Sequence, residues 1–136
     1  MAAVYLDSCI VIYLIEEEPA IRTRLWGLLR NPFVDGRIRL SPLTRLECRV
    51  LPLRQQDKAL LAKYDFFFRH SGARLIAMTK TVFDQATALR ATYRLKTADA
   101  LHLAVAIVGG CDEFWTNDDR LAKAAAGQVR VVKPLG

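Results

Sequence analysis

Four acidic residues of this chain stand where a charged group is costly or unusually placed. Each lies beside or inside an apolar stretch that is typical of a strand end or of the first turns of a helix; they are Asp7, Glu47, Asp99 and Asp118. A buried carboxylate needs a cation, a hydrogen-bond donor or a raised pKa, and hard divalent cations prefer oxygen ligands. The pattern therefore indicates a metal site assembled from distant parts of the chain.

Each acid also has a simpler structural interpretation. Asp7 and Asp118 can cap the helices expected after them, because Asp is a favoured N-cap. Glu47 can form a capping box with Thr44, although the pair Ser41-Pro42 is the better start signal for that helix. Both interpretations remain open at each position.

The position of Glu47 within its helix argues against a capping box. With Ser41 as the cap, Leu43, Leu46 and Val50 are expected to form the stripe that faces the core. The 3.6-residue repeat puts Glu47 on the same face as this stripe. We therefore expect Glu47 to be partly enclosed and to need a partner.

Asp99 opens a helix that is otherwise almost wholly apolar through Val108 and is expected to be buried on most sides. The helix dipole favours an acid in the first turn, so this position alone is only suggestive. His102 follows one turn later and is either a metal ligand or a core histidine whose hydrogen bonds are satisfied. The second alternative is the commoner one and is the one we expect.

The elements that must position these residues alternate along the chain. Short apolar runs predict strands at 3–6, 38–40, 74–78, 114–116 and 129–132, while 9–15 is either a buried helix start or a further strand. Helices are expected around 21–29, 42–51, 60–70, 82–95, 97–108 and 121–126. Pro52 should break or kink the helix at 42–51. Thr97 should cap the helix at 97–108, which Gly109 and Gly110 should end, and 31–36 should form a turn.

Strands separated by helices predict a parallel sheet covered on both faces. The expected fold is therefore α/β, a three-layer α/β/α sandwich with a central parallel sheet of about five strands. Ligands of such sheets gather outside the carboxyl ends of the strands. Asp7 directly follows the first expected strand and Asp118 follows the fourth by two residues, so both should lie at one edge of the sheet.

Length and composition set the outer limits. The 136 residues, 52% of them hydrophobic, suit one domain over 1–136 with a core of its own. Twenty Lys and Arg against fourteen acids give a net charge of +6, which suits either a polyanion held near a cation or ordinary solubilising charge. We find no Ser/His/Asp or Cys/His constellation that would supply a protein nucleophile.

The three cysteines are odd in number, lie in apolar surroundings and form no Cys-x-x-Cys pair; they are Cys9, Cys48 and Cys111. Neither a zinc site nor a disulfide framework is expected, and the cytoplasm is the simplest location. The longest apolar runs, 9–15 and 100–108, are far shorter than a bilayer span, and no basic region precedes an apolar one at the start. We therefore expect neither secretion nor membrane insertion.

The segments around the acids resemble, in order, the four motifs of the PIN domain. They are Val4-Tyr5-Leu6-Asp7-Ser8, Ser41-Pro42-Leu43-Thr44-Arg45-Leu46-Glu47, Thr97-Ala98-Asp99-Ala100-Leu101-His102-Leu103-Ala104 and Phe114-Trp115-Thr116-Asn117-Asp118. The resemblance extends to about Val132, and the length suits the VapC-type toxin ribonucleases of bacterial and archaeal toxin–antitoxin pairs. Each motif is weak by itself, and the ordered set is more specific.

The resemblance implies a single PIN-like domain with an acidic quartet that is both catalytic and metal-binding: Asp7, Glu47, Asp99 and Asp118. Asp7 and Asp99 would be direct ligands, and Ser8, Thr116 and Asn117 would support them. Asp119 is the alternative to Asp118 as the fourth acid. The implied cofactor is Mg²⁺ or Mn²⁺, as one or two ions.

The implied activity is metal-dependent endonucleolytic hydrolysis of RNA phosphodiester bonds. A bound ion can lower the pKa of a water and neutralise the departing oxygen, so no protein nucleophile is needed. Basic residues near the motifs are candidates either for phosphate contacts or for a solvated surface; they are Arg45, Arg49, Arg94, Lys96 and Arg120.

The implied partners are a cognate antitoxin, which would occupy the cleft and insert an Arg among the acids, and a second copy of the chain, in a homodimer or a larger toxin–antitoxin assembly. An aromatic surplus at Tyr64, Phe66, Phe67 and Phe68 is either such a contact surface or part of a helix packed on both sides. The sequence does not separate a toxin from a housekeeping nuclease.

The rival hypothesis is a non-catalytic metal-binding or receiver-like regulatory module. A receiver needs a lysine at a later strand end facing its acids, and the fourth strand here ends Thr116-Asn117-Asp118 instead.

Overall fold

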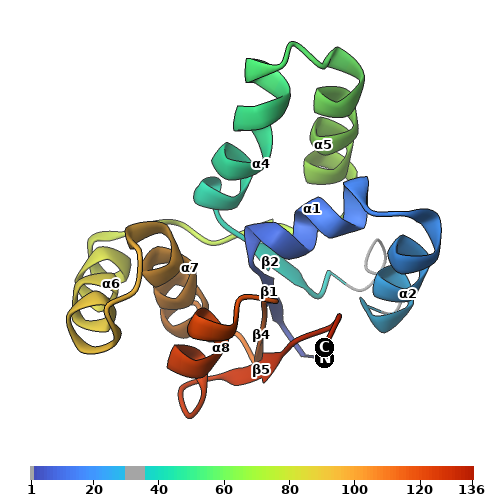
Figure 1. The fold of residues 1–136 in the computed structure, drawn as a ribbon. Helices are drawn as coiled ribbons and strands as arrows, with labels where there is room; N and C mark the ends of the chain where they lie inside the picture. The colour runs from blue at the N-terminus through green and yellow to red at the C-terminus, as the bar shows by residue number, and fades with distance from the viewer. Residues whose placement is uncertain (1, 30–35) are drawn as a thin grey trace.

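The computed structural model describes residues 2–29 and 36–136, and it shows an α/β fold built on a five-stranded sheet (Figure 1). Neighbouring strands pair in parallel in the order β3-β2-β1-β4-β5, and in the middle of the sheet Tyr5 lies opposite Arg39 and Phe114. The strands are β1 Val4–Leu6, β2 Ile38–Leu40, β3 Arg74–Leu75, β4 Glu113–Trp115 and β5 Arg130–Val132.

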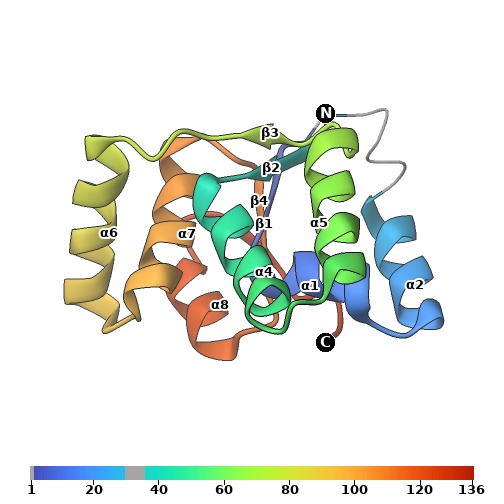
Figure 2. The ribbon, with the colours of Figure 1, turned by 90° about the horizontal axis from the view of Figure 1, so that it is seen from above.

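Helices connect the strands and cover both faces of the sheet. Figures 1 and 2 show α6 and α7 on one side and α1 and α2 on the other, with α4 and α5 side by side. Segment 9–15 is helical, and residues 31–35 of the expected turn lie outside the described residues. The helices are α1 Ser8–Glu16, α2 Pro19–Leu29, α4 Pro42–Arg54, α5 Lys58–His70, α6 Lys80–Tyr93, α7 Thr97–Val108 and α8 Asp119–Ala125.

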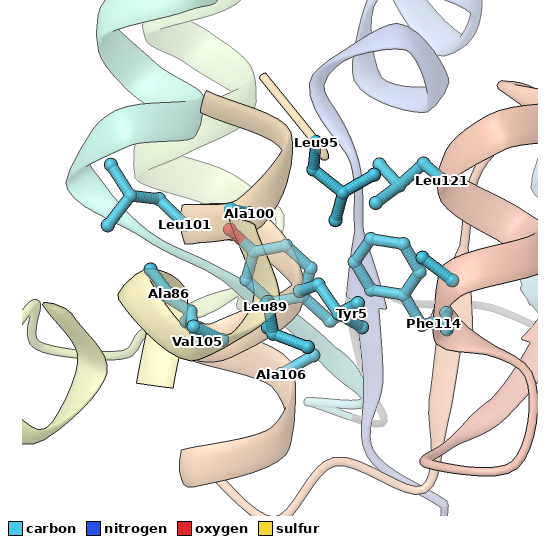
Figure 3. Close-up of a cluster of buried hydrophobic side chains, with 14 of the residues drawn as sticks. Tyr5, Ala86, Leu89, Leu95, Ala100, Leu101, Val105, Ala106, Phe114 and Leu121 are labelled. Carbon is cyan, nitrogen blue, oxygen red and sulfur yellow. The ribbon is translucent and has the colours of Figure 1, made fainter. Parts of the chain in front are cut away.

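The alternation of side chains along β1 separates two hydrophobic clusters. Tyr5 points into one cluster with Phe114 and residues of α6, α7 and α8, as Figure 3 shows. Val4 and Leu6 point the other way, against α1, α2 and α5. The expected three-layer sandwich with a parallel sheet of five strands is therefore confirmed.

Helix α4 begins as expected but presents a different face to the core. Ser41 is its N-cap, and the Ser41 backbone N–H donates to Thr44 Oγ1 at 3.3 Å, so Thr44 does not pair with Glu47 as a capping box. The buried row is Thr44, Cys48 and Pro52, at a spacing of four residues. Pro52 does not end the helix, which continues to Arg54.

The stripe expected to face the core from α4 was therefore wrong. Leu46 and Val50 are 57% and 40% exposed, and Leu43 is partly buried. The Thr44 row faces inward instead, and Cys48 belongs to the hydrophobic cluster that includes residues of α1 and α5.

Helix α7 fits its apolar sequence. Ala100 through Ala106 are buried, as expected. Thr97 is the first helical residue rather than the cap, which is Lys96 with no side-chain cap bond. The helix ends at Gly109, where an added Cβ would lie 2.8 Å from the Val105 carbonyl oxygen, so the end requires glycine.

Strand β3 is shorter than the expected 74–78. Its two residues are exposed at the edge of the sheet, and the Ile76 N–H adds one more bond to the Leu40 carbonyl at 2.8 Å before the chain leaves for α6. In the described part of the chain, no helix is long and apolar enough to cross a membrane.

Candidate functional site

The carboxyl ends of β1 and β4 lie side by side at the point where the chain changes direction across the sheet. After β1 the chain enters α1 on one face, and after β4 it enters α8, which belongs to the cluster on the other face. The Asp7 N–H still bonds to the Trp115 carbonyl at 3.0 Å, so the two strand ends stay adjacent. A switch point of this kind leaves a crevice in which α/β proteins bind ligands.

A pocket of about 390 Å³ occupies this crevice. The four acids singled out from the sequence all contribute to its wall, although they come from four separate segments of the chain. The lining residues are Asp7, Ser8, Cys9, Tyr13, Glu47, Asp99, Asn117 and Asp118.

Asp7 is held firmly from two directions. Its Oδ1 accepts the Ser8 N–H at 2.8 Å, which caps α1, and its Oδ2 accepts the Thr116 hydroxyl at 2.8 Å. The Cys9 thiol lies 3.4 Å from the same Oδ2; burial and the charge of Asp7 raise the pKa of this thiol to about 12, so it donates as S–H. Asp7 therefore caps α1 and lines the pocket at the same time, and it is only 6% exposed.

Glu47 is half-buried at the edge of the pocket. Its Oε1 accepts the Ser8 hydroxyl at 2.7 Å and contacts His102 Nε2. Partial burial acts to raise the pKa of Glu47, but the hydrogen bonds from His102 and Ser8 outweigh it, and the pKa lies below its usual value. The carboxylate is therefore stabilised in its ionised form.

Asp99 experiences the opposite balance. Partial burial raises the pKa of Asp99 most, and the negative charges of Asp7 and Asp118 raise it further, against smaller opposing effects from His102 and Lys96. The pocket thus gathers carboxylates that repel one another when no cation lies between them.

The structure separates the two neighbouring candidates for the fourth acid. Asp118 caps α8 through the Leu121 N–H at 2.9 Å and also lines the pocket. Both acids are exposed, but Asp119 forms an ion pair with Lys133 and does not line the pocket. Asp118 thus caps a helix and lines the pocket at the same time. Its position favours Asp118 over Asp119 as the fourth acid of the site.

His102 is nearer to the acids than we expected. It is 1% exposed, its Nε2 contacts Glu47 and lies 3.9 Å from Asp7 Oδ1, and its Nδ1 lies 2.7 Å from the Tyr5 hydroxyl. The expectation of a satisfied core histidine is met, but its partners belong to the site. The available signal was its place one turn after Asp99 in an apolar helix, where an imidazole needs polar partners.

The donor set fits a hard cation bound together with water. In residues 2–29 and 36–136 no three His, Cys, Asp or Glu side chains are already close enough to hold a metal ion. Mg²⁺ typically takes one or two carboxylates and keeps several waters, so a complete protein cage is not required. Oxygen donors around a pocket and the repulsion felt by Asp99 suit such an ion.

The five basic candidates differ in their surroundings. Arg49 pairs with Asp65 at 2.9 Å, between α4 and α5, whereas Arg45 is exposed beside a separate small pocket. Lys96 is exposed, and its charge is felt by Asp99. Arg94, which ends α6 with a positive φ of 55°, and Arg120 are exposed as well.

Comparison with known proteins assigns the family. The model of the PIN domain matches residues 4–127, and the chain belongs to the PIN domain family, as its motifs predicted. Ribonuclease VapC46 of Mycobacterium tuberculosis is 34% identical over 129 residues, which cover 92% of each chain.

Solved structures share the fold at lower identity. VapBC2 of Rickettsia felis, bound to a DNA fragment from its promoter, has a TM-score of 0.78 at 15% identity and covers 96% of this chain and 97% of its own. VapC20 of M. tuberculosis, a toxin that cleaves the sarcin-ricin loop, has a TM-score of 0.72 at 19% identity, over 94% and 99% of the two chains.

The strand order argues against the receiver-like alternative. Receivers use the order 2-1-3-4-5, whereas this sheet has β3-β2-β1-β4-β5. A lysine does follow the last strand, but this residue, Lys133, forms an ion pair with the exposed Asp119.

Proposed function

We propose that this protein is a metal-dependent endoribonuclease that hydrolyses RNA phosphodiester bonds and acts as the toxin of a type II toxin–antitoxin system. The observation that carries the proposal is the convergence of Asp7, Glu47, Asp99 and Asp118 on one pocket at the switch point of a PIN-family sheet. The similarity to Ribonuclease VapC46 supports the reaction class.

The proposed cofactor is Mg²⁺ or Mn²⁺, as one or two ions. Asp7 and Asp99 would hold the ion, with Glu47 and Asp118 completing the acidic wall. When bound, the ion would activate a water and neutralise charge on the departing oxygen.

The remaining tasks belong to the chain itself. Thr116 and the Ser8 backbone fix the two oxygens of Asp7, and the Ser8 hydroxyl holds Glu47. Asn117 lines the pocket and accepts the Leu135 N–H at 3.4 Å, which ties the loop after β4 to the end of the chain.

The net charge of +6 supports a polyanionic substrate. Exposed basic side chains near the motif segments are the proposed phosphate contacts; they are Arg45, Arg94, Lys96 and Arg120. Arg49 is the weakest candidate, because its guanidinium already pairs with Asp65.

A cognate antitoxin is the proposed partner, as in the toxin–antitoxin complexes that share the fold. Tyr64 and Phe67 are buried, whereas Phe66 is 58% exposed and lines a largely apolar groove of about 440 Å³ between α1, α2 and α5. Such a groove suits an apolar antitoxin segment.

We also propose that the protein forms a homodimer or a larger assembly and acts in the cytoplasm. Its three free cysteines suit that reducing compartment.

Cleavage of a structured RNA in Mg²⁺ or Mn²⁺ tests the function. Asp7→Asn and Asp99→Asn should each lower the rate about 100-fold or more, because each removes a proposed ligand of the ion that would stabilise the developing charge. Asp119→Asn is the matched control, because it changes an exposed acid next to the site, and it should keep the parental rate. Equal rates in all four proteins would indicate a contaminating nuclease and refute the proposal.

A further inference from the structure

His102 connects the core of the protein to an acid of the pocket without reaching solvent itself. Its Nδ1 lies 2.7 Å from the Tyr5 hydroxyl, and its Nε2 contacts Glu47 Oε1 and lies 3.2 Å from Ser8 Oγ. The ring is 1% exposed, so these side chains, rather than water, decide how it is oriented.

Tyr5 is a buried, fixed hydrogen-bond partner of this ring. It is fully buried on β1, and its ring stacks on Phe114 with centroids 5.8 Å apart; Figure 3 shows its hydroxyl oxygen on the side of α7. The hydroxyls of Ser41 and Thr44 lie 2.9 and 3.3 Å from the same oxygen and can donate to it. The phenolic hydrogen is then free to be donated to His102 Nδ1.

This arrangement determines which hydrogen faces Glu47. If Tyr5 donates to Nδ1, the imidazole is neutral and carries its hydrogen on Nε2. A protonated ring would instead donate from Nδ1 to the Tyr5 oxygen, and it too would carry a hydrogen on Nε2. In either charge state an N–H group points at Glu47 Oε1, so the argument does not depend on the charge of the ring.

Both donors to Glu47 select the same oxygen. Ser8 Oγ donates to Oε1 at 2.7 Å, beside the contact from His102. Within the described residues, every hydrogen bond to this carboxylate falls on Oε1, which leaves Oε2 for a ligand of the pocket. Glu47 is on a helix whose neighbouring Leu46 and Val50 face solvent, so without these donors its side chain would be free to turn outward.

We propose that His102, oriented by Tyr5, is a positioning residue that holds the Glu47 carboxylate with one oxygen presented to the pocket. This inference deepens the proposed function and rests on it. Side chains that orient a metal ligand from behind typically account for about 10- to 100-fold in metal affinity or activity.

Nitrogen NMR of the imidazoles tests the orientation without metal or RNA. The chain has two histidines, and the other, His70, is exposed on α5, so the signals can be assigned. The expected result for His102 is a hydrogen on Nε2, with Tyr5→Phe producing a mixture of the two tautomers. A neutral ring carrying its hydrogen on Nδ1 would overturn the proposal, since Nε2 could not then donate to Glu47.

Calorimetric titration with Mn²⁺ tests the consequence. His102→Leu should weaken binding about 10- to 100-fold, whereas His102→Gln, which keeps an N–H donor, should recover most of the loss. The matched control is His70→Leu, which removes the exposed histidine that packs against Phe66 and should bind as the parent does.

A double-mutant cycle separates positioning from general packing. In a Glu47→Gln background, His102→Leu should weaken Mn²⁺ binding less than twofold further. An unchanged affinity in His102→Leu, or an equal loss in both backgrounds, would refute the positioning role. A parent that binds no Mn²⁺ would refute the metal-dependent function instead, and the NMR result would then decide the orientation. If His102→Leu does not fold, Tyr5→Phe replaces it in the Mn²⁺ titration, because this change removes only the hydroxyl that orients His102 and keeps the buried ring.

Discussion

Individual residues of the pocket serve the fold and the site together. Asp7 and Asp118 each cap a helix and line the pocket. A cap draws the carboxylate toward backbone N–H groups, which offset part of its negative charge. Asp99 has no cap role of this kind, and its pKa is raised by burial and by its acidic neighbours. Its negative charge should therefore cost folding stability.

Asp99→Asn should stabilise the metal-free protein. The folded-state pKa lies above the ordinary value of 3.8, so the ionised carboxylate destabilises the fold above the folded pKa, and protonation removes this cost as the pH falls. Because Asp99 is only partly buried, solvent screens part of this repulsion, and we expect a gain of at most about 1 kcal/mol at pH 7.5 that shrinks toward pH 4.

Urea denaturation in EDTA at both pH values measures the gain. Asp84→Asn, which removes an exposed acid on α6, is the control and should change stability by less than about 0.5 kcal/mol. An Asp99→Asn protein no more stable than the parent at pH 7.5 would contradict the repulsion argument.

Among the elements, the end of α6 carries a backbone conformation that is unfavourable for its residue. Arg94 closes the helix at φ 55° and ψ 37°, the left-handed region in which glycine is the usual helix-ending residue. An L-residue there costs roughly 1–2 kcal/mol, part of which glycine offsets through its greater freedom in the unfolded chain. An arginine at this position therefore fits a role for its side chain, which is the phosphate contact proposed above.

Arg94→Gly should raise the free energy of unfolding by up to about 1 kcal/mol and weaken RNA binding. Arg94→Ala is the matched control, because it removes the same charge but keeps the strained conformation, so it should weaken RNA binding without any gain in stability. Thermal unfolding and RNA binding at two salt concentrations measure both effects. Equal stabilities of the Gly and Ala proteins would show that the backbone carries no strain.

At the scale of the whole molecule, the pocket joins two halves of the sheet whose helices pack in separate hydrophobic clusters. An ion held by acids from several segments would bind the folded chain much more tightly than the unfolded one. Its binding free energy would then add to folding stability.

Mn²⁺ at about a hundred times its dissociation constant should stabilise the parent by about 2.7 kcal/mol. For a chain of this length the corresponding rise in Tm is roughly 10 °C. EDTA should reverse the shift, and Asp7→Asn should show little of it. Scanning calorimetry measures the change, and an unmoved Tm in millimolar Mn²⁺ would contradict an ion site in this pocket.

Local pattern predicted the elements well because burial in a parallel sheet leaves continuous apolar runs. The runs before Asp7 and Asp118 marked β1 and β4, and Val82, Ala86 and Leu89 proved to be the buried face of α6. The strand order β3-β2-β1-β4-β5 could not be predicted from the sequence, because periodicity does not specify which strands are neighbours.

The errors concern contacts between distant segments. The buried face of α4 is the Thr44 row rather than the leucine stripe, because the packing of α4 on distant segments, which local periodicity does not specify, decides which face is buried. The role of His102 depends on Tyr5 and Glu47, which are 97 and 55 residues away in the sequence. No short segment of the sequence contains these residues together, so a local pattern could not predict their contacts.

The bond between Thr116 and Asp7 spans 109 positions of the sequence. While the chain is being made, Asp7 is added about 5 to 22 s before its partner Thr116, at 5–20 residues per second. The pocket therefore has no complete wall during most of translation. A nascent enzyme built in this way would be unable to attack the messenger and ribosomal RNA around it until synthesis had passed β4.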